Sequence, residues 1–518
     1  MHALHSAVPN AGASAPEGLL NLHGARLLIF VVAYDAERTL QSVLDRIPAS
    51  LHQEGVEVLV IDDCSKDRTF DIGRSTRSKG LRISTLRNPV NQRYGGNQKL
   101  GYRYAIDHGF DVVALLHGDG QYAPGKLPDL LGPILAGEAD AVLGSRMLHR
   151  GAARRGGMPP YKYVGNRILS AFQNWILGTR LSEFHSGYRA YTVDALRQIP
   201  FERNTNEFHF DTEIINQLVF RKLRLVEVPI PTYYGDELCH VDGLRYAWDV
   251  CKTMLLARLH QLNLLYDRKF DVDANDEHYD LKIGYVSSHT LALAAVNPDG
   301  TLLDLGCGQG LWSELAALKG ARVTAVDQFA PIGKPSSNAR VRYIRWNLDS
   351  ARFPAVVSRF DQIFLLDIVE HLRDPEAFLD QLRQAAGGKR PDVILTTANI
   401  GFFVTRLMLL LGRFNYGRKG ILDRTHTRLF TFGTLQKLLE QAGYLVEEIR
   451  GIPAPYPSAI GLNRWSRVLL WINCELIRLC HGLFSYQIYV RARAVPTVHQ
   501  LLAETIEASG LRSEQVRN

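Results

Sequence analysis

Carboxylates that follow apolar runs are the residues of this 518-residue chain best suited to chemistry. The run DVVALL over residues 111–116 ends in His117-Gly118-Asp119-Gly120-Gln121, and the run over 56–61 ends in Asp62-Asp63. In a parallel sheet such ends meet at one edge, where α/β proteins bind ligands. Carboxylates gathered there repel one another, so a divalent cation is the expected partner. Mg²⁺ or Mn²⁺ takes few protein carboxylates and completes its shell with diphosphate oxygens and water.

A second constellation lies in the other half of the chain. The strand-like residues 301–305 (TLLDL) run into the glycine-rich turn 306–310, and a second apolar run, 322–326, ends in Asp327. This separation suits a carboxylate that accepts two ribose hydroxyls. The acidic Asp304 precedes the glycines, whereas a dinucleotide site usually shows GxGxxG. Two nucleotide-binding interpretations therefore remain at this point.

The elements that position these residues alternate along the chain. Continuous apolar runs predict buried strands at 27–33, 56–61, 82–86 and 111–116. Helical spacing follows at 36–47 and 95–108. Repeated βα units predict an α/β fold with a doubly wound parallel sheet. The segment 91–96 (NQRYGG) precedes a helix whose free N–H groups can hold an anion.

Composition limits the function classes. Hydrophobic residues make up 46% of the chain and charged residues 22%, as in soluble globular proteins, and the length suggests two or three domains. The net charge of +7 is spread without a basic cluster, which argues against a nucleic-acid protein but allows attraction to phosphates or an anionic membrane surface. The six cysteines have no metal-binding spacing, so we expect a reduced, cytoplasmic protein without structural zinc.

No signal peptide or membrane-spanning run is evident. Two segments, 400–412 and 466–485, look amphipathic; a helix packed on a domain core is favoured over one lying on a membrane surface, and the second alternative stays open. The organisation we expect is a flexible tail, a first domain, a linker, a second domain and a tail, at residues 1–23, 24–262, 263–285, 286–495 and 496–518.

Over residues 26–260 the chain resembles the family 2 glycosyltransferases of the GT-A fold, and within them the dolichyl-phosphate mannosyltransferase-like branch. Each motif alone is weak, and their order and spacing carry the resemblance. The motifs are VVAYDAERTL (31–40), VIDDCSKDRT (60–69), YGGNQKLGYRYAI (94–106), HGDGQYAP (117–124), GSR (144–146), SGYRAY (186–191), FHFDTE (208–213) and VPIPTYYG (228–235).

The resemblance implies a role for each matching position. Asp119 matches the last carboxylate of the DxD motif and would ligate Mg²⁺ or Mn²⁺, while His117 replaces the first Asp. Asp211 or Glu213 would be the general base. Residues implied at the acceptor are Arg146, Ser186 and Arg189. Residues implied to bind the nucleotide-sugar donor are Ala33, Tyr34, Glu37, Asp62, Asp63, Gly95, Gly96, His117 and Gln121.

The family resemblance implies single displacement with inversion, but the acceptor stays open. A saccharide hydroxyl must lose a proton as it attacks, so it needs a base such as Asp211. A lipid phosphate is already ionised, so it needs positioning by arginines such as Arg146 and Arg189. The chain contains both sets. An uncharged His117 would weaken metal affinity without excluding the metal, and a structural role for this histidine is equally open.

Residues 285–450 resemble class I S-adenosylmethionine-dependent methyltransferases of Rossmann-like fold. The motifs are DLGCGQG (304–310), FDQIFLLDIVEHL (360–372), VILTTAN (393–399) and GILDRTHTRLFT (420–431). The resemblance implies that Asp327 holds the ribose, that Asn347, Leu348 and Asp349 approach the adenine, and that Asp367 lies by the sulfonium. The positions implied to line the methionine part of the cofactor are Asp304, Gly306, Gly308 and Gly310.

Methyl transfer is an in-line displacement in which positioning does most of the work. For a hydroxyl acceptor, His371 and His426 are the candidate bases, with a buried structural histidine as the equal alternative. Residues 451–490 are expected to complete the methyltransferase sheet and cover its substrate mouth.

The sequence thus predicts a bifunctional transferase that builds and O-methylates a cell-surface polysaccharide, glycolipid or lipid-linked sugar. One alternative is an active methyltransferase attached to a nucleotide-sugar-binding module of weak activity. Another is a scaffold that recruits partners through 466–485. The location expected is cytoplasmic, with contact at the inner face of the cell membrane left open, and oligomeric state is not predicted.

Overall fold

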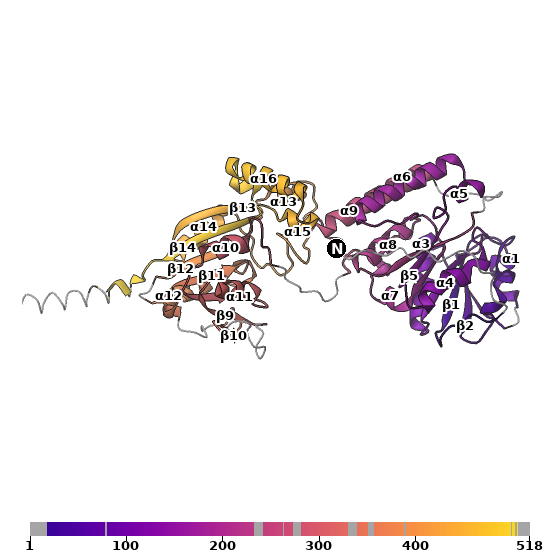
Figure 1. Ribbon diagram of the computed structural model, residues 1–518, viewed down its shortest axis with the longest axis horizontal. Coiled ribbons are helices and arrows are strands. Elements are labelled where there is room, and N and C mark those ends of the chain that lie inside the picture. Colours follow the sequence, from indigo (N-terminus) through magenta and orange to yellow (C-terminus); the bar gives the residue numbers. More distant parts are fainter. Residues whose placement is uncertain are drawn as a thin grey trace, which may run out of the picture. The chain divides into compact units, whose positions relative to one another are not determined.

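The structure is a computed structural model that describes residues 18–77, 80–232, 242–262, 264–272, 281–329, 339–350, 357–387, 390–498, 500–502 and 505. It divides into two compact units, one holding the described residues up to His260 and from Asp267 to Val272, the other holding the remainder (Figure 1). Most of the predicted tails 1–23 and 496–518, and 273–280 of the predicted linker, lie outside the described residues. The domain boundaries stay proposals.

The first unit is built on a seven-stranded sheet in the order β3-β2-β1-β4-β6-β5-β7. Its strands are β1 (Leu27–Ala33), β2 (Val56–Asp62), β3 (Arg82–Arg87), β4 (Val112–His117), β5 (Ala141–Ser145), β6 (Arg189–Thr192) and β7 (Leu225–Pro229). β1 lies between β2 and β4 and pairs in parallel with both, so that Ala33 lies opposite Asp62 and Val32 opposite His117. This register brings the polar residues after three strands to one edge.

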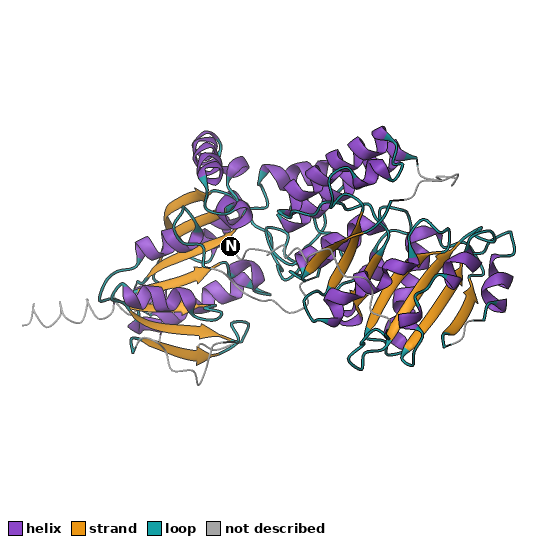
Figure 2. Cartoon of the chain, turned by 45° about the vertical axis from the view of Figure 1, so that its right-hand side comes forward, coloured by secondary structure: helices purple, strands orange, loops and turns teal. Residues whose placement is uncertain are grey.

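Helices cover both faces of this sheet (Figure 2). The helices are α1 (Leu40–Asp45), α2 (Thr69–Ser75), α3 (Arg93–Asp107), α4 (Leu127–Leu135), α5 (Ala152–Arg155), α6 (Pro160–Leu177), α7 (Val193–Arg197), α8 (Phe210–Phe220) and α9 (Gly243–Gln261). Alternate residues of β1 enter two cores: Ile29 packs with α1 and α4, and Phe30 packs with α3 and α8. Burial on both faces explains the unbroken apolar run.

The second unit has a seven-stranded sheet in the order β10-β9-β8-β11-β12-β14-β13. Its strands are β8 (Thr301–Leu305), β9 (Arg322–Asp327), β10 (Val341–Arg345), β11 (Gln362–Leu366), β12 (Asp392–Ala398), β13 (Tyr444–Ile452) and β14 (Gln487–Ala494). Its helices are α10 (Ser288–Ala295), α11 (Leu311–Leu318), α12 (Pro375–Ala386), α13 (Phe403–Leu410), α14 (Phe432–Gln441), α15 (Tyr456–Ile460), α16 (Arg464–Leu479) and α17 (His481–Phe484). α12 and α14 pack on one face, α10 and α11 on the other.

The α/β class is confirmed in both units, but the expectation of a wholly parallel first sheet is wrong. β6 is antiparallel to both β4 and β5. In the second sheet β14 lies antiparallel between β12 and β13, which confirms that the segment 451–490 leads into a strand that completes the sheet.

The helix predicted at 36–47 begins later, at Leu40. The residues before it are held in a loop by side chains that follow β2. Ser65 Oγ accepts from the N–H of Asp35 (2.9 Å), and Thr69 Oγ1 accepts from the N–H of Ala36 (2.8 Å). These two bonds hold the chain after β1 against the loop after β2, where the prediction had placed the first helical turn.

Within the described residues, no helix is both long enough and apolar enough to cross a bilayer.

Candidate functional sites

Asp119 stands exposed in the turn after β4. Its Oδ1 accepts from the N–H of Gln121 (2.9 Å), and the turn is anchored to β1 because the N–H of Gly118 donates to the carbonyl of Val32 (2.8 Å). The described residues contain no cluster of three side chains able to hold a metal. One exposed carboxylate nevertheless fits a Mg²⁺ or Mn²⁺ ion that takes its other ligands from substrate phosphates and water.

His117, at the end of β4, is packed rather than exposed. Its ring is 9% exposed and meets the rings of Tyr94 (5.7 Å between centroids) and Tyr122 (4.9 Å) edge to face. Burial lowers the pKa of His117, with Asp119 opposing, so the imidazole is neutral at physiological pH. A Cβ on Gly187 would lie 2.7 Å from Nε2, so only glycine fits beside the ring.

The His117 Nε2 atom is buried and has no hydrogen-bond partner among the described residues. A buried polar atom without a partner is costly, so a group bound at this strand end would gain by supplying one. A neutral imidazole can hydrogen-bond a sugar or ribose hydroxyl, but it is a poor ligand for a hard cation.

The two carboxylates after β2 hold the surrounding loops. Asp62 is fully buried; its Oδ1 accepts from the N–H of Ser65 (3.2 Å) and its Oδ2 pairs with Nε of Arg87 (3.3 Å). Asp63 is 3% exposed, and its Oδ1 accepts from Asn88 Nδ2 and from the N–H of Gln92, both at 2.7 Å. Neither carboxylate has the open surface that direct nucleotide contact needs.

Tyr34 and Glu37 retain surface at the same edge. Tyr34 is 47% exposed, and the neighbouring carboxylate of Asp35, together with partial burial, raises the pKa of its phenol. Glu37 Oε2 accepts from the N–H of Arg68 (3.2 Å). The preceding Ala33 is buried and pairs with Asp62 across the sheet. After β1, the exposed ring of Tyr34 and the half-buried carboxylate of Glu37 are therefore available to contact the nucleobase of a donor.

Gly95 and Gly96 lie inside α3, not ahead of it, and are buried against the protein. The N–H of Gly95 donates to the carbonyl of Asn206 (2.8 Å), and a Cβ there would lie 2.5 Å from the carbonyl oxygen of Thr205. A Cβ on Gly96 would lie 3.1 Å from the Asn206 side chain. Both glycines therefore allow close approach of the chain before α8, and the N–H of Gly95 is already bonded within the protein.

Asp211, in the first turn of α8, is held by three groups. It is 5% exposed; Tyr94 Oη donates to Oδ2 (2.9 Å), Gln98 Nε2 donates to Oδ1 (3.4 Å), and Arg189 Nη1 lies 3.4 Å from Oδ1. The sequence analysis missed Tyr94, which lies within the matched motif 94–106 and links Asp211 to the ring of His117. A carboxylate so engaged is poorly placed to accept a proton from a sugar hydroxyl.

The predicted acceptor arginines are also engaged. Arg189 is 1% exposed and donates to the carbonyls of Ser186 (2.8 Å), Phe184 (2.9 Å) and Asp211 (3.0 Å). Arg146 is 8% exposed, and its Nε donates to Oε1 of Glu183 (3.0 Å). Burial opposes ionisation of Glu183, yet Arg146 holds the pKa of that carboxyl below its usual range.

Glu213 and Ser186 do not face open space either. Glu213 is fully buried; its Oε1 accepts from Lys269 Nζ (2.7 Å) and its Oε2 from the N–H of Thr205 (2.6 Å). Ser186 is 3% exposed, and its Oγ accepts from the N–H of Tyr188 (3.3 Å). Glu213, Arg146, Ser186 and Arg189 are thus buried in contacts that fix the protein around β5, β6 and α8, and their roles at an acceptor stay predictions.

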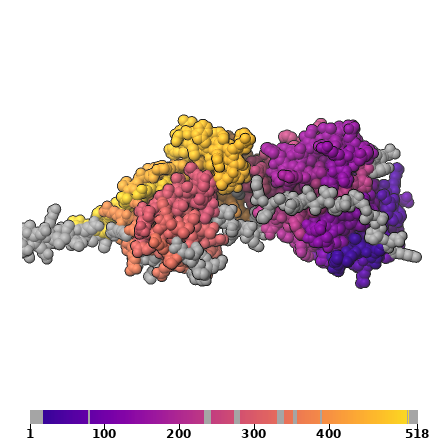
Figure 3. Space-filling model, in the orientation of Figure 1, coloured from indigo at the N-terminus to yellow at the C-terminus, as the bar shows by residue number. Residues whose placement is uncertain are grey.

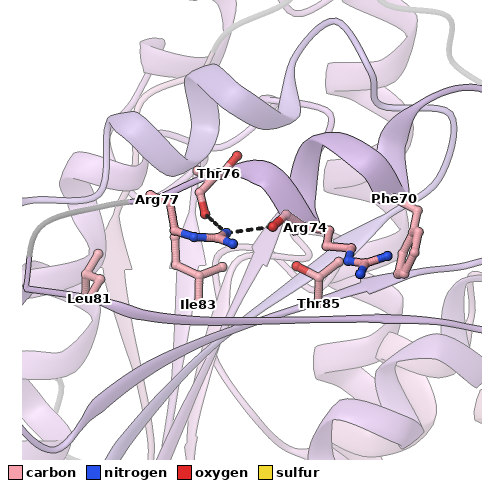
Figure 4. Close-up of a pocket in the computed structure, with 7 residues that line it drawn as sticks. All are labelled: Phe70, Arg74, Thr76, Arg77, Leu81, Ile83 and Thr85. Carbon is pink, nitrogen blue, oxygen red and sulfur yellow. Dashed lines mark hydrogen bonds between the residues drawn. The ribbon is translucent and has the colours of Figure 1, made fainter.

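A cavity of about 310 Å³ lies elsewhere in the first unit, against α2 and the edge strand β3 (Figure 4). Arg77 beside it donates from Nη1 to the carbonyls of Arg74 (2.7 Å) and Thr76 (3.0 Å). None of the predicted site residues lines this cavity, so it adds nothing to the site at the β4 edge. Its lining residues are Phe70, Arg74, Thr76, Arg77, Leu81, Ile83 and Thr85.

In the second unit, the glycine-rich turn after β8 uses left-handed backbone at Gly306 (φ 86°), Gly308 (φ 54°) and Gly310 (φ 79°). A Cβ on Gly306 would strike Ile368, and one on Gly310 would strike Tyr343, whereas one on Gly308 would meet nothing within 4 Å. The first and last glycines thus permit close packing, and the middle one faces open space.

Asp327, at the end of β9, reaches the middle of this turn. Its Oδ2 accepts from the N–H of Gly308 (2.9 Å), and its Oδ1 accepts from that of Phe329 (2.8 Å). The carbonyl of Asp327 accepts from the N–H of Trp346 (3.0 Å), which brings exposed Asn347 and half-buried Leu348 to the same edge. Open space at Gly308 beside a partly exposed carboxylate fits the ribose end of S-adenosylmethionine.

Asp304 is buried beneath this turn at 3% exposure and accepts a hydrogen bond from Ser313 Oγ. Burial raises the pKa of its carboxyl to about 7. Asp304 therefore ties the turn to α11. It can attract the positive sulfonium of S-adenosylmethionine only when its carboxyl is ionised.

Asp367 follows β11 with φ 55°, a backbone conformation that non-glycine residues rarely adopt. Its side chain accepts from Gln487 Nε2 (2.7 and 2.8 Å) and Thr396 Oγ1 (2.8 Å), and Lys282 Nζ lies 3.8 Å away. Burial opposes ionisation, yet Lys282 and these bonds hold the pKa of Asp367 below its ordinary value. Lys282 and Gln487 lie outside the motifs of this unit, and Thr396 lies within the motif 393–399 without having been singled out.

His371 and His426 are brought together, with ring centroids 4.7 Å apart. His371 Nδ1 lies 3.1 Å from Thr425 Oγ1, and His426 Nδ1 lies 3.0 Å from the carbonyl of Ile421. Burial, and then the neighbouring His371, lower the pKa of His426. The sequence analysis missed Glu370, which is 2% exposed and whose pKa burial raises well above its usual range.

Both units match known families. Residues 28–199 match the family described as glycosyl transferase family 2, and residues 279–449 match a methyltransferase domain. An undecaprenyl-phosphate mannosyltransferase of Micrococcus luteus is 28% identical over 41% of this chain and 85% of its own length. A UDP-N-acetylglucosamine–dolichyl-phosphate N-acetylglucosaminyltransferase of Methanococcus voltae is 24% identical over 40% and 86%. A ubiquinone biosynthesis O-methyltransferase of Schizosaccharomyces pombe is 26% identical over 29% and 57%.

Proposed function

Because the chain joins a family 2 glycosyltransferase domain of GT-A fold to a methyltransferase domain, we propose that it carries out two transfers. The first unit moves a sugar from a nucleotide-sugar to a lipid phosphate. The second moves a methyl group from S-adenosylmethionine to a hydroxyl of a sugar or glycolipid acceptor. Assembly and methylation of one cell-surface glycan would give both steps a common product.

The state of Asp211 favours a lipid phosphate over a saccharide in the first reaction. A hydroxyl nucleophile needs a base within hydrogen-bond reach. Asp211 is buried and already holds Tyr94 and Arg189, and Glu213 is buried in a pair with Lys269. A phosphate oxygen is ionised and attacks without a base. The relatives named for undecaprenyl-phosphate and dolichyl-phosphate add support.

Exposed arginines after β5 are the cations we assign to the acceptor phosphate. β5 and β4 are both antiparallel to β6, so β5 runs parallel to β4 and its chain leaves the sheet at the edge where Asp119 lies. The chain then passes through exposed Arg150, Arg154 and Arg155. Arg146 and Arg189 are buried in ion pairs with Glu183 and Asp211. We therefore assign the acceptor phosphate to the three exposed arginines instead.

The donor is held at the ends of β1 and β4. Tyr34 and Glu37 meet the base, His117 and Gln121 meet the sugar or ribose, and Asp119 holds Mg²⁺ or Mn²⁺. The bound metal offsets charge on the departing diphosphate. The single displacement that the family resemblance implies would invert the configuration at the anomeric carbon.

In the second reaction the chain orients two partners. Asp327 accepts the ribose hydroxyls, Asn347 and Leu348 border the adenine, and Asp367 provides negative charge where the sulfonium lies. Bound S-adenosylmethionine supplies an activated methyl group. His371, whose Nδ1 lies beside Thr425 Oγ1, accepts the proton of an attacking hydroxyl, and the ring of His426 packs against it and positions it.

The first reaction is tested with purified protein, labelled UDP- and GDP-sugars, Mn²⁺ and undecaprenyl phosphate, by following label into the organic phase. Asp119→Asn should lower turnover at least about 100-fold, and Asp129→Asn, on the exposed surface of α4, should leave it unchanged. Turnover by Asp119→Asn equal to that of the natural chain would refute the assignment.

A second candidate function follows from His117. Because this neutral, buried ring stands where the family has a carboxylate, the first unit could bind a nucleotide-sugar without turning it over. Calorimetric binding that depends on Asp119, with no transfer to any lipid phosphate or saccharide, would favour this candidate.

The second reaction is tested by calorimetry with S-adenosylmethionine. Binding to Asp327→Asn should be at least about tenfold weaker, because the carboxylate that accepts hydrogen bonds from both ribose hydroxyls is lost. Glu440→Gln, an exposed carboxylate on α14, is the control. Equal affinity in both variants would remove the ribose role from Asp327, and failure of the natural chain to bind S-adenosylmethionine would favour the scaffold alternative.

A further inference from the structure

α16 turns apolar side chains outward. Its spacing of three and four residues aligns them in one stripe along the helix. Their exposed fractions range from 38% to 82%. The stripe consists of Trp465, Val468, Leu469, Ile472 and Leu479.

The inner face of the same helix is held by polar residues. Asn473 is 3% exposed; its Oδ1 accepts from the N–H of Ala454 (2.9 Å) and its Nδ2 donates to the carbonyl of Phe484 (2.8 Å). Ser466 is fully buried at the start of the helix. A helix that packs only on its own domain buries its apolar stripe. α16 instead exposes its apolar stripe and buries the polar Ser466 and Asn473. This corrects the preference for a core-packed helix at 466–485.

α13 adds a second exposed apolar segment. Leu407, Leu409, Leu410 and Leu411 are 50% to 82% exposed at its end. The start of α13 meets the end of α17, where the rings of Phe403 and Phe484 lie 5.9 Å apart. α17 follows α16 directly, so both segments belong to one region of the second unit, seen near α13, α15 and α16 in Figure 1 and as part of the yellow surface in Figure 3.

This region carries a strong excess of positive charge. Residues 400–424 and 461–485 hold eight lysines and arginines but only two acidic residues, Asp423 and Glu475. Arg413 and Lys419 are exposed after α13, and Arg464 and Arg467 are exposed along one side of the α16 stripe. Apolar residues bordered by arginine and tryptophan suit the interface of an anionic bilayer.

We propose that the exposed face of α13 and α16 binds the surface of an anionic lipid membrane, with the apolar stripe among the acyl chains and the arginines among the headgroups. A second copy of the chain would bring the same cations together, which is unfavourable. Because no described helix can span a bilayer, we propose that α16 lies along the membrane surface.

The face is tied to the proposed methyl site by short segments. Asn399, directly after β12, donates from Nδ2 to the carbonyl of Ser485 (2.8 Å), and Gln487, two residues on, donates to Asp367. Membrane binding here would present the site to an acceptor held in the membrane. That consequence rests on the methyl transfer proposed above, whereas the binding itself does not.

Co-sedimentation of the full chain with vesicles tests the binding. Vesicles of phosphatidylcholine alone should retain little protein, and vesicles containing phosphatidylglycerol should retain most of it. The double variant Trp465→Ser/Ile472→Ser should lose at least about tenfold in affinity, and Arg464→Glu/Arg467→Glu should lose binding to the anionic vesicles. Leu318→Ser and Leu445→Ser, exposed apolar positions elsewhere on the unit, should behave as the natural chain.

The first unit also exposes tryptophans, Trp175 on α6 and Trp248 on α9. A Trp175→Ser/Trp248→Ser variant therefore runs in parallel. Loss of vesicle binding in that variant alone, no vesicle binding by the natural chain, or a dimer that the α16 variant dissociates would each overturn the proposal. Retained S-adenosylmethionine binding and circular dichroism show that a variant is folded, and turnover is not the readout, so failure here is separable from failure of the proposed reactions.

Discussion

Arg189 shows how far burial can move a residue away from the role its motif implies. Its guanidinium, 1% exposed, joins the turn at Phe184 and Ser186 to the start of α8 through three carbonyls. The planar fork of arginine meets several acceptors at fixed angles, which a lysine ammonium cannot do. The residue therefore organises the site that it was expected to enter.

Arg189→Lys should lower the unfolding free energy of the first unit by about 3 kcal/mol, because buried carbonyls and the Asp211 carboxylate lose donors. Denaturant titration followed by a first-unit tryptophan checks this. Arg197→Lys, whose natural side chain is exposed beside Asp194, should change the free energy by less than about 0.5 kcal/mol. Similar values for the two variants would contradict the buried role.

Asp304 makes stability depend on pH in a definite direction. Its folded pKa of about 7 lies above that of an unfolded aspartate, near 3.9, so the folded state binds the extra proton. The stabilisation is complete below about pH 4 and is lost as pH rises through 7. Asp304→Asn should remove a change in stability of about 4 kcal/mol between pH 4 and pH 8, measured by denaturation of the protein without S-adenosylmethionine at both pH values. Parallel slopes in variant and natural chain would show that Asp304 is not protonated.

At the residue scale, the sequence predicts which residue types gather at each strand end, because strand polarity alone brings them there. It does not predict which of them keep open surface. Asp62 is paired with Arg87, and Glu213 is paired with Lys269. These partners come from distant segments that no local sequence pattern identifies. Lys282 and Gln487 reach Asp367 in the same way.

At the scale of elements, α3 depends on a missing side chain. A Cβ on Gly101 would lie 2.2 Å from the ring of Phe30, which is fully buried in β1 and has no room to move. Gly101→Ala should destabilise the first unit by about 1–3 kcal/mol through overpacking, despite the better helix propensity of alanine.

Gly165 is the matched control for this prediction, since a Cβ there meets nothing within 4 Å and the residue also lies inside a helix, α6. Gly165→Ala should raise the melting temperature slightly, with a gain of about 0.5–1 kcal/mol. Thermal denaturation of the two variants should therefore move in opposite directions, and a shared direction would contradict the packing of α3 on β1.

Strands were the most predictable elements. β1 has the predicted bounds, and β2 and β4 lie within one residue of theirs, because burial on both faces leaves a continuous apolar run. The direction of β6 was not predictable: its four residues carry no periodicity, and the long segment between β5 and β6 allows either direction. The exposed apolar stripe of α16 has the same pattern in sequence as a buried one.

At the scale of the whole molecule, each unit has its own sheet and cores. We expect two unfolding transitions in calorimetry. S-adenosylmethionine at a hundred times its Kd should stabilise only the second unit, by about 2.7 kcal/mol, and the tenfold weaker binding expected of Asp327→Asn should reduce the shift to about 1.4 kcal/mol or less. A single transition, or a shift in both, would show that the units do not unfold independently.

The placement of β14 has a consequence for the order of events during synthesis. This strand, made of residues 487–494, lies between β12 and β13, so β13 has no neighbour in the sheet until β14 has emerged from the ribosome. The first unit is complete more than two hundred residues earlier. A nascent chain therefore holds a finished first unit while the second still exposes unpaired strand edges, and such edges favour aggregation during this interval.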